Sequence, residues 1–191
     1  MMRVVTCIDG QNLYRLAREA WGTDGSALDT PYNWPSYDVA KLAAAVSGLS
    51  PSRTLAKVCF YTGVPDSGRW HQFWNSKLRR LRNQGIVVTR SVVSRHGREK
   101  GTDIGLAIDL VTDTYEQEYD VAIIVSQDAD FAPAVRRAKQ VARKQGRFVT
   151  IQSSFPEVPG EQPSGIRGTT FIPIGKTLYD TCLEPGRYQP V

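Results

Sequence analysis

Four aspartates stand where a folded chain could bring their carboxylates together. One directly follows an apolar segment typical of a buried strand, two follow another such segment, and one opens a predicted helix: Asp9, then Asp128 and Asp130, then Asp103. In an open α/β sheet, groups at the carboxyl ends of neighbouring strands meet in one crevice. We therefore expect a cluster of carboxylates, which would repel one another unless a divalent cation binds between them.

The types of side chain in this cluster indicate which cation would bind there. Carboxylate oxygens without cysteine or histidine favour Mg²⁺ or Mn²⁺. Such a cation can activate a bound water and neutralise charge on a phosphate, so the residue set is compatible with a metal-dependent site that acts on a polyanion. Zinc is not expected, because the chain has only His71 and His96 as histidines and no C-x-x-C pair. Cys7 and Cys59 lie in apolar segments, where buried reduced thiols are expected.

The same aspartates also have a purely structural interpretation. Aspartate and threonine are good helix N-caps, so Asp9, Thr102 and Asp128 could do no more than begin helices. Asp130 adds a second carboxylate close to Asp128, which is more than one cap requires.

The other acidic residues of the segment 103–130 are not expected to bind the cation directly. Asp109 lies six residues after Asp103 and faces a different side of its helix, so we expect it to be solvated or to act indirectly. Ordinary surface positions are expected for Asp113, Glu116, Glu118 and Asp120.

Charge is distributed unevenly along the chain, although the net charge is only +5. Residues 67–102 carry nine bases and one acid, 103–130 carry eight acids and no base, and 131–150 carry six bases and no acid. An acidic segment between basic ones suits a metal site acting on a polyanion. The alternative is amphipathic helices with solvated charged faces. The expected phosphate-backbone contacts are Arg79, Arg80, Arg82, Arg90, Arg95 and Arg98, with Arg136, Arg137 and Lys139 after the acidic segment.

Apolar strand-like segments alternate with helical patterns along the chain. Strands are predicted over residues 4–8, 55–61, 86–93, 121–125 and 148–151, and helices over 13–20, 37–46, 70–83, 103–115 and 132–145. This alternation indicates a parallel sheet covered on both faces. The expected fold class is therefore α/β, a three-layer sandwich with a central, mainly parallel sheet.

Two further segments have distinctive compositions. Residues 152–168 are rich in proline, glycine and serine and predict a long surface loop, followed by a strand-like segment over 169–174. Aromatic residues in or near the first long loop either stack unpaired bases or pack that loop on the core: Trp21, Tyr32, Trp34 and Tyr37. Three aromatics at helical spacing are expected in the core: Trp70, Phe73 and Trp74.

Three motifs in order give the chain a family resemblance. They are Asp9-x-x-Asn12 after the first strand, Lys100-Gly101-x-Asp103 opening a helix, and Ser126-x-Asp128-x-Asp130-Phe131 after a strand. Over about residues 3–151 the chain resembles the NYN domain family, the PIN-like ribonucleases that include the LabA/DUF88 group. The resemblance implies a strand order of about 3-2-1-4-5. It also implies a nuclease domain over residues 1–151, with 152–191 as an extension packed on the same domain.

The resemblance further implies a Mg²⁺- or Mn²⁺-dependent endoribonuclease site. Carried over by position, the metal-binding and catalytic acids would be Asp9, Asp103 and Asp128, with Asp130 as a fourth. Polar support would come from Asn12, Ser126 and Lys100, although Lys100 could equally be a surface charge. The chain departs from the family at Gln127, where glycine is usual.

Three functions are compatible with these residues. The first is a metal-dependent ribonuclease acting on single-stranded or structured RNA, and the second is a non-catalytic RNA-binding module with the same fold. A phosphotransfer domain is disfavoured, because no second acid stands two residues after Asp9. The longest aliphatic run, Val121–Val125, is far too short to span a membrane. We expect a soluble cytoplasmic protein with no membrane partner, and a homodimer is left open.

Overall fold

The computed structural model describes residues 1–23, 30–93, 101–160 and 162–185. Its centre is a six-stranded sheet with the order β3-β2-β1-β4-β5-β6, in which every neighbouring pair is parallel. The strands are β1 (Met2–Asp9), β2 (Arg53–Pro65), β3 (Val87–Val93), β4 (Val121–Val125), β5 (Thr150–Pro156) and β6 (Thr170–Ile174). The predicted parallel sheet and strand order are confirmed, and β6 extends the order by one strand.

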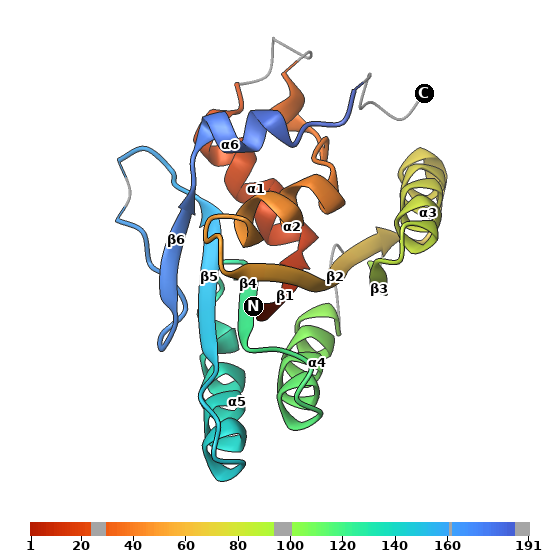
Figure 1. Cartoon of the computed structure of the whole chain (residues 1–191). Coiled ribbons are helices and arrows are strands. Elements are labelled where there is room, and N and C mark those ends of the chain that lie inside the picture. Colours follow the sequence, from red (N-terminus) through yellow and green to blue (C-terminus); the bar gives the residue numbers. More distant parts are fainter. Residues whose placement is uncertain (24–29, 94–100, 161, 186–191) are drawn as a thin grey trace.

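Helices cover both faces of the sheet, which confirms the three-layer sandwich. Six α-helices are described: α1 (Gly10–Trp21), α2 (Val39–Ser47), α3 (Gly68–Asn83), α4 (Thr102–Tyr115), α5 (Ala132–Lys144) and α6 (Lys176–Thr181). Two short 3₁₀ turns, η1 (Pro31–Asn33) and η2 (Ala129–Phe131), complete the order. Figure 1 shows α1, α2 and α6 on one side of the sheet and α4 and α5 on the other.

Strand β4 shows why the core has two halves. Val121, Ile123 and Val125 belong to the apolar cluster under α1, α2, α3 and α6. The alternate residues Ala122 and Ile124 belong to the cluster under α4 and α5. Successive strand side chains point to opposite faces, so a strand covered by helices on both sides must be apolar throughout.

The sheet places the site residues through its register. Strand β1 lies between β2 and β4, and Ile8 pairs with Val125. Asp9 and Ser126 therefore leave the sheet side by side at its carboxyl edge. The chain proceeds from β1 to β2 on one side and returns to β4 on the other, so this edge is the point where strand order reverses and a crevice forms.

The prediction of a surface loop over residues 152–168 is wrong for its first part. Residues 152–156 complete strand β5, and Ser153 and Ser154 are fully buried. Their small side chains fit between packed layers, and the Ser154 hydroxyl donates a hydrogen bond to the Ile172 carbonyl at 2.9 Å. The polar composition of this segment did not indicate a buried strand. Hydrogen bonds to residues 16 and 18 positions away in the sequence offset the cost of burying these hydroxyls.

Asp113 corrects a second expectation, since its side chain is buried and not on the surface. Lys57 Nζ donates to both of its carboxylate oxygens, at 2.8 and 2.9 Å. Asp113 follows Leu110 by three residues and so shares the inward face of α4. The buried cysteines are confirmed as free thiols. Among the described helices, none is long and apolar enough to cross a membrane.

Candidate active site

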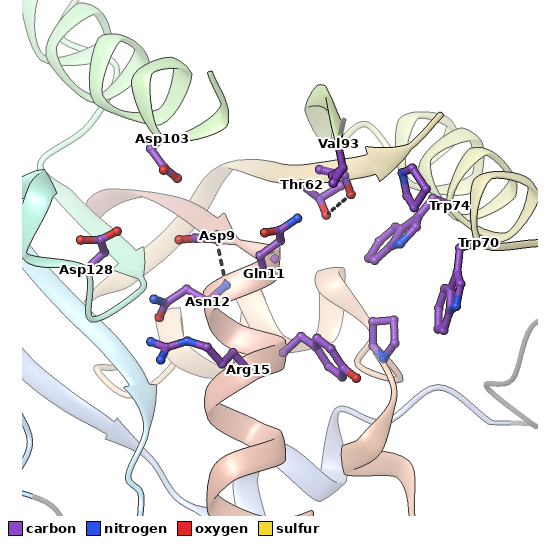
Figure 2. Close-up of a pocket in the computed structure, with 15 residues that line it drawn as sticks. Asp9, Gln11, Asn12, Arg15, Thr62, Trp70, Trp74, Val93, Asp103 and Asp128 are labelled. Atoms are coloured by element: carbon purple, nitrogen blue, oxygen red, sulfur yellow. Dashed lines mark hydrogen bonds between the residues drawn. The ribbon is translucent and has the colours of Figure 1, made fainter. Parts of the chain in front are cut away.

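A cleft of about 760 Å³ opens at the carboxyl edge of the sheet, above the ends of β1 and β2 (Figure 2). Its lining residues come from six elements and their connections: Asp9, Gly10, Gln11, Asn12, Tyr14, Arg15, Pro35, Thr62, Gly63, Pro65, Trp70, Trp74, Val93, Asp103 and Asp128. Figure 2 shows the three aspartates at one end of the cleft and the two tryptophans at the other.

Asp9 is held by one hydrogen bond to each carboxylate oxygen. It ends β1 and caps α1, and its Oδ1 accepts from the backbone N–H of Asn12 at 3.0 Å. Its Oδ2 accepts from the Ser126 hydroxyl at 3.2 Å, across the β1–β4 boundary. Asp9 therefore does cap α1, as the structural interpretation predicts. Its half-buried carboxylate nevertheless lines the cleft.

Asp128 is positioned by the same serine. The Ser126 hydroxyl accepts from the Asp128 backbone N–H at 3.1 Å, and Asp128 Oδ1 accepts from the Asp130 backbone N–H at 2.9 Å. One buried hydroxyl thus joins the Asp9 carboxylate to the backbone of Asp128, which is far away in sequence. The Ser126 hydroxyl therefore positions the Asp9 side chain and the Asp128 backbone, and the Asp130 N–H holds the Asp128 side chain.

Gln127 and Asn12 make a second link between β4 and α1. The Gln127 backbone N–H donates to Asn12 Oδ1 at 3.2 Å. Among the described residues other than glycine, only Gln117 has a positive φ, so Gln127 occupies backbone that any residue adopts. The glycine usual at this position is therefore not needed for the turn.

Asp103 reaches the same end of the cleft from the opposite helical layer. It lies in the first turn of α4, and its side chain is exposed. The preceding Gly101 has φ 106°, a left-handed conformation that glycine adopts without strain. Figure 2 shows Asp103 pointing from α4 toward Asp9 and Asp128. Three carboxylates from three elements therefore face one space.

The start of α1 is built on tight packing beneath the cleft. A Cβ atom at Gly10 would stand 2.6 Å from the Phe60 ring, so only glycine fits directly after Asp9. The Tyr37 hydroxyl donates to the Gly10 carbonyl at 2.9 Å. Burial raises the pKa of Tyr37 well above its ordinary value, and the charge of Asp9 acts in the same direction.

The donor set of the acidic end fits Mg²⁺ or Mn²⁺ in its chemistry. All of its side-chain ligands are oxygens. Within the described residues, no three acidic, histidine or cysteine side chains stand close enough together to enclose an ion. Mg²⁺ commonly binds one or two carboxylates and keeps several waters, so a full protein cage is not required.

A model of the NYN domain matches residues 3–158. The chain belongs to the NYN domain family. This NYN domain therefore has a PIN-like nuclease fold, and the family is generally nuclease-like, related to nucleic acids and usually dependent on divalent metals.

The other comparisons bear on the fold alone. No curated protein matches this NYN domain. Among solved structures, it is similar to a protein of unknown function from Vibrio parahaemolyticus RIMD 2210633, with 20% identity and a TM-score of 0.60. The likeness covers 92% of this chain and 94% of that chain.

Some predicted site residues lie elsewhere. Asp130 is exposed and does not line the cleft of the NYN domain. Asp109, which was expected to be solvated or to act indirectly and was not a predicted ligand, is half-buried and accepts a hydrogen bond from the Tyr61 hydroxyl at 2.8 Å. The predicted contacts Arg95, Arg98 and Lys100 lie outside the described residues.

The predicted basic residues divide between two ends of the molecule. Helix α3 follows the carboxyl end of β2 and leads to the start of β3, so its last turns lie at the opposite edge of the sheet. Those turns carry Arg79, Arg80 and Arg82, all exposed. From Trp70 in the cleft to Arg80 the helix rises about 15 Å. In contrast, Arg136 and Arg137 lie near the start of α5, which is at the cleft edge.

Several cleft residues were missed by the sequence interpretation. Arg15 and Gln11 line the cleft from α1, and Arg15 has an exposed ion pair with Glu19 at 3.5 Å. Residues 11, 12 and 15 fall on one helical face, so the spacing from Asn12 was an available signal. Trp70 and Trp74 also line the cleft. The core prediction is confirmed for Trp74, whereas Trp70 is only partly buried against the core.

The aromatic residues of the first loop are packed against the protein. Tyr37 is fully buried, and Tyr32 is 9% exposed. Trp21 contacts the Tyr179 ring at 5.0 Å between centroids. Trp34 stacks on Trp70 at 5.8 Å. The packing interpretation is therefore correct for this group.

Proposed function

We propose that this NYN domain is a divalent-metal-dependent endoribonuclease that hydrolyses RNA phosphodiester bonds. One observation carries the proposal: Asp9, Asp103 and Asp128 come from three separate elements and line the same end of one cleft. Carboxylates gathered in this way repel one another without a cation. A cytoplasmic location belongs to the same proposal.

Each residue of the acidic end has a distinct role in this proposal. One or two of the carboxylates of Asp9, Asp103 and Asp128 would bind Mg²⁺ or Mn²⁺, with water as the remaining ligands. The bound ion would lower the pKa of a water ligand and neutralise charge on the phosphate. Ser126 and Asn12 keep Asp9 and the β4 loop in place through the hydrogen bonds described above. The exposed guanidinium of Arg15 binds a backbone phosphate on the cleft wall.

Cleavage of labelled RNA by the purified protein, with Mn²⁺ and with EDTA, tests this proposal. We expect cleavage with Mn²⁺ and none with EDTA. Asp9→Asn and Asp128→Asn should each lower the rate at least about 100-fold, because a charged ligand becomes neutral. Asparagine still caps a helix, so thermal unfolding should show both variants folded. Glu118→Gln, at an exposed position beyond α4, is the matched control and should cleave like the wild type.

A non-catalytic RNA-binding module is the second candidate. It is favoured by the hydrogen bond that each Asp9 carboxylate oxygen already accepts and by the absence of a three-acid metal group within the described residues. Binding of RNA without cleavage at any Mn²⁺ or Mg²⁺ concentration would favour this candidate and exclude the first.

A further inference from the structure

The end of the cleft opposite the carboxylates is walled by aromatic rings. Trp70 and Trp74, both from α3, line this end, and Pro35 and Tyr14 are further apolar or aromatic residues of the same cleft. Figure 2 shows the two tryptophans on the far side of Gln11 and Thr62 from the aspartates. One continuous cleft therefore has a charged end and an aromatic end.

The rings are held by other rings behind them. Trp70 stacks on Trp34 with centroids 5.8 Å apart and planes at 23°, and it meets Phe73 edge-on at 5.5 Å. Trp74 stacks on Phe60 at 6.2 Å with planes at 27°. Such contacts fix the orientation of each indole, so little conformational entropy is lost when a ligand packs against it.

The exposure of the two tryptophans suits contact with a ligand. Trp74 is 9% exposed and belongs mainly to the core, whereas Trp70 is only half-buried although it is a large apolar side chain. A core role explains Trp74 but leaves the open part of Trp70 without a function. Nucleic-acid bases are planar and stack on aromatic side chains regardless of their sequence.

We propose that Trp70, supported by Trp74, forms a base-binding platform for single-stranded nucleic acid. An unpaired base packs at the aromatic end while a neighbouring phosphate lies at the carboxylate end. Bases within a duplex are stacked on each other and cannot enter, so the platform selects single-stranded substrate. This inference rests on the proposed function, because it adds a substrate class to the same cleft.

Fluorescence anisotropy with labelled single-stranded RNA tests the platform directly. Binding is measured in Mg²⁺ and again in EDTA, with the RNA checked on a gel to confirm that it is intact. Trp70→Ala should weaken binding about 5- to 20-fold, as expected for one lost base–aromatic stack. Trp70→Phe should retain most of the affinity. A duplex of the same sequence should bind more weakly than the single strand and should not respond to Trp70→Ala.

Trp21→Ala is the matched control, because Trp21 is also half-buried and packed on other rings but does not line the cleft. It should bind RNA like the wild type. Thermal unfolding should show that Trp70→Ala is folded at the assay temperature. Equal losses for Trp21→Ala and Trp70→Ala would overturn the platform, because both would then act through stability.

RNAs with a single abasic nucleotide at successive positions give a second test. The wild type should lose affinity at one or two positions, and Trp70→Ala should not discriminate among them. If the protein cleaves RNA but Trp70→Ala binds every RNA like the wild type, the platform is wrong and the proposed ribonuclease stands. If no RNA is cleaved but binding still depends on Trp70, the ribonuclease is wrong and the platform stands. Absence of binding in both buffers overturns the platform.

Discussion

The two ends of the cleft are built by different means. At the acidic end, Asp9 and Asp128 follow parallel strands and are connected by the Ser126 hydroxyl. At the aromatic end, Trp70 is held by ring packing against Trp34, a residue of a loop far away in sequence. Backbone topology positions the first group, and side-chain packing positions the second. The first end supplies groups for chemistry, whereas the second supplies a surface that recognises a substrate.

The largest expected effect is a difference in cleavage rate between substitutions of Asp103 and Asp130, which both belong to the sequence motifs. Asp103→Asn should lower the cleavage rate about 100-fold, because Asp103 lines the acidic end of the cleft. Asp130→Asn should change the rate less than about 3-fold, because its exposed carboxylate lies outside the cleft and only its backbone N–H contacts Asp128. Single-turnover cleavage of labelled RNA measures both. Equal losses in the two variants would extend the acidic end to Asp130.

A smaller effect should distinguish the basic residues at the two edges of the sheet. The double substitution Arg136→Ala and Arg137→Ala should weaken RNA binding about 10-fold and lower the slope of log affinity against log salt by about 1. Arg137 also lines a shallow hollow between α5 and α4, together with Ile104 and Ala107. Filter binding at several salt concentrations gives both quantities.

The matched pair for that experiment is Arg79→Ala with Arg80→Ala, on the last turns of α3. Arg80 is within 3.8 Å of Glu184 and lies at the far edge of the sheet. We expect a smaller loss of affinity from this pair. If the α3 pair has the larger effect, the RNA follows α3 away from the carboxylates.

The smallest expected effect concerns Tyr37, a buried residue that supports the start of α1 through Gly10. Tyr37→Phe removes the hydrogen bond to the Gly10 carbonyl and should lower the free energy of unfolding by about 1 kcal/mol near pH 8. Because burial raises the folded-state pKa of Tyr37, its contribution is complete below about pH 10 and is lost as the pH rises further. Urea unfolding between pH 8 and pH 11 should therefore show a weaker alkaline loss in the variant.

Tyr115→Phe controls for the loss of a tyrosine hydroxyl, since Tyr115 is 70% exposed. Its unfolding free energy should match the wild type across this pH range. An unchanged alkaline slope in Tyr37→Phe would show that the hydroxyl is not shielded in the folded protein.

Much of the fold could be predicted from local patterns. The apolar run Val121–Val125 predicted a strand buried on both faces, and β4 has those bounds. The helix expected over 103–115 begins one residue earlier, at Thr102, because Gly101 serves as its cap. The buried half of β5 was missed, because Ser153 and Ser154 resemble loop residues until their hydrogen-bond partners are known.

The acidic end could also be predicted in outline, whereas the aromatic end could not. An aspartate directly after a strand must lie at the carboxyl edge of a parallel sheet, whichever strand follows. The indole of Trp70 has no such constraint. Helical spacing shows which residues share the helix face of Trp70, but it does not show which part of the protein packs against that face. The same limit applies to Arg79 and Arg80. Their charge predicted a nucleic-acid surface, but it could not show at which edge of the sheet they lie.

The sequence by itself determined the alternation of strands and helices, the placement of Asp9, Asp103 and Asp128 at element boundaries, and the oxygen-only character of their ligands. Those features depend on residue type and on the spacing of residues close together in the sequence, so they can be predicted without knowing the fold. Only the tertiary structure decided that Asp130 stays outside the cleft, that Asp113 is buried against Lys57, and that Trp70 lines the same cleft as the carboxylates, at its other end. These outcomes depend on which distant surfaces pack together, and such packing is a property of the whole fold.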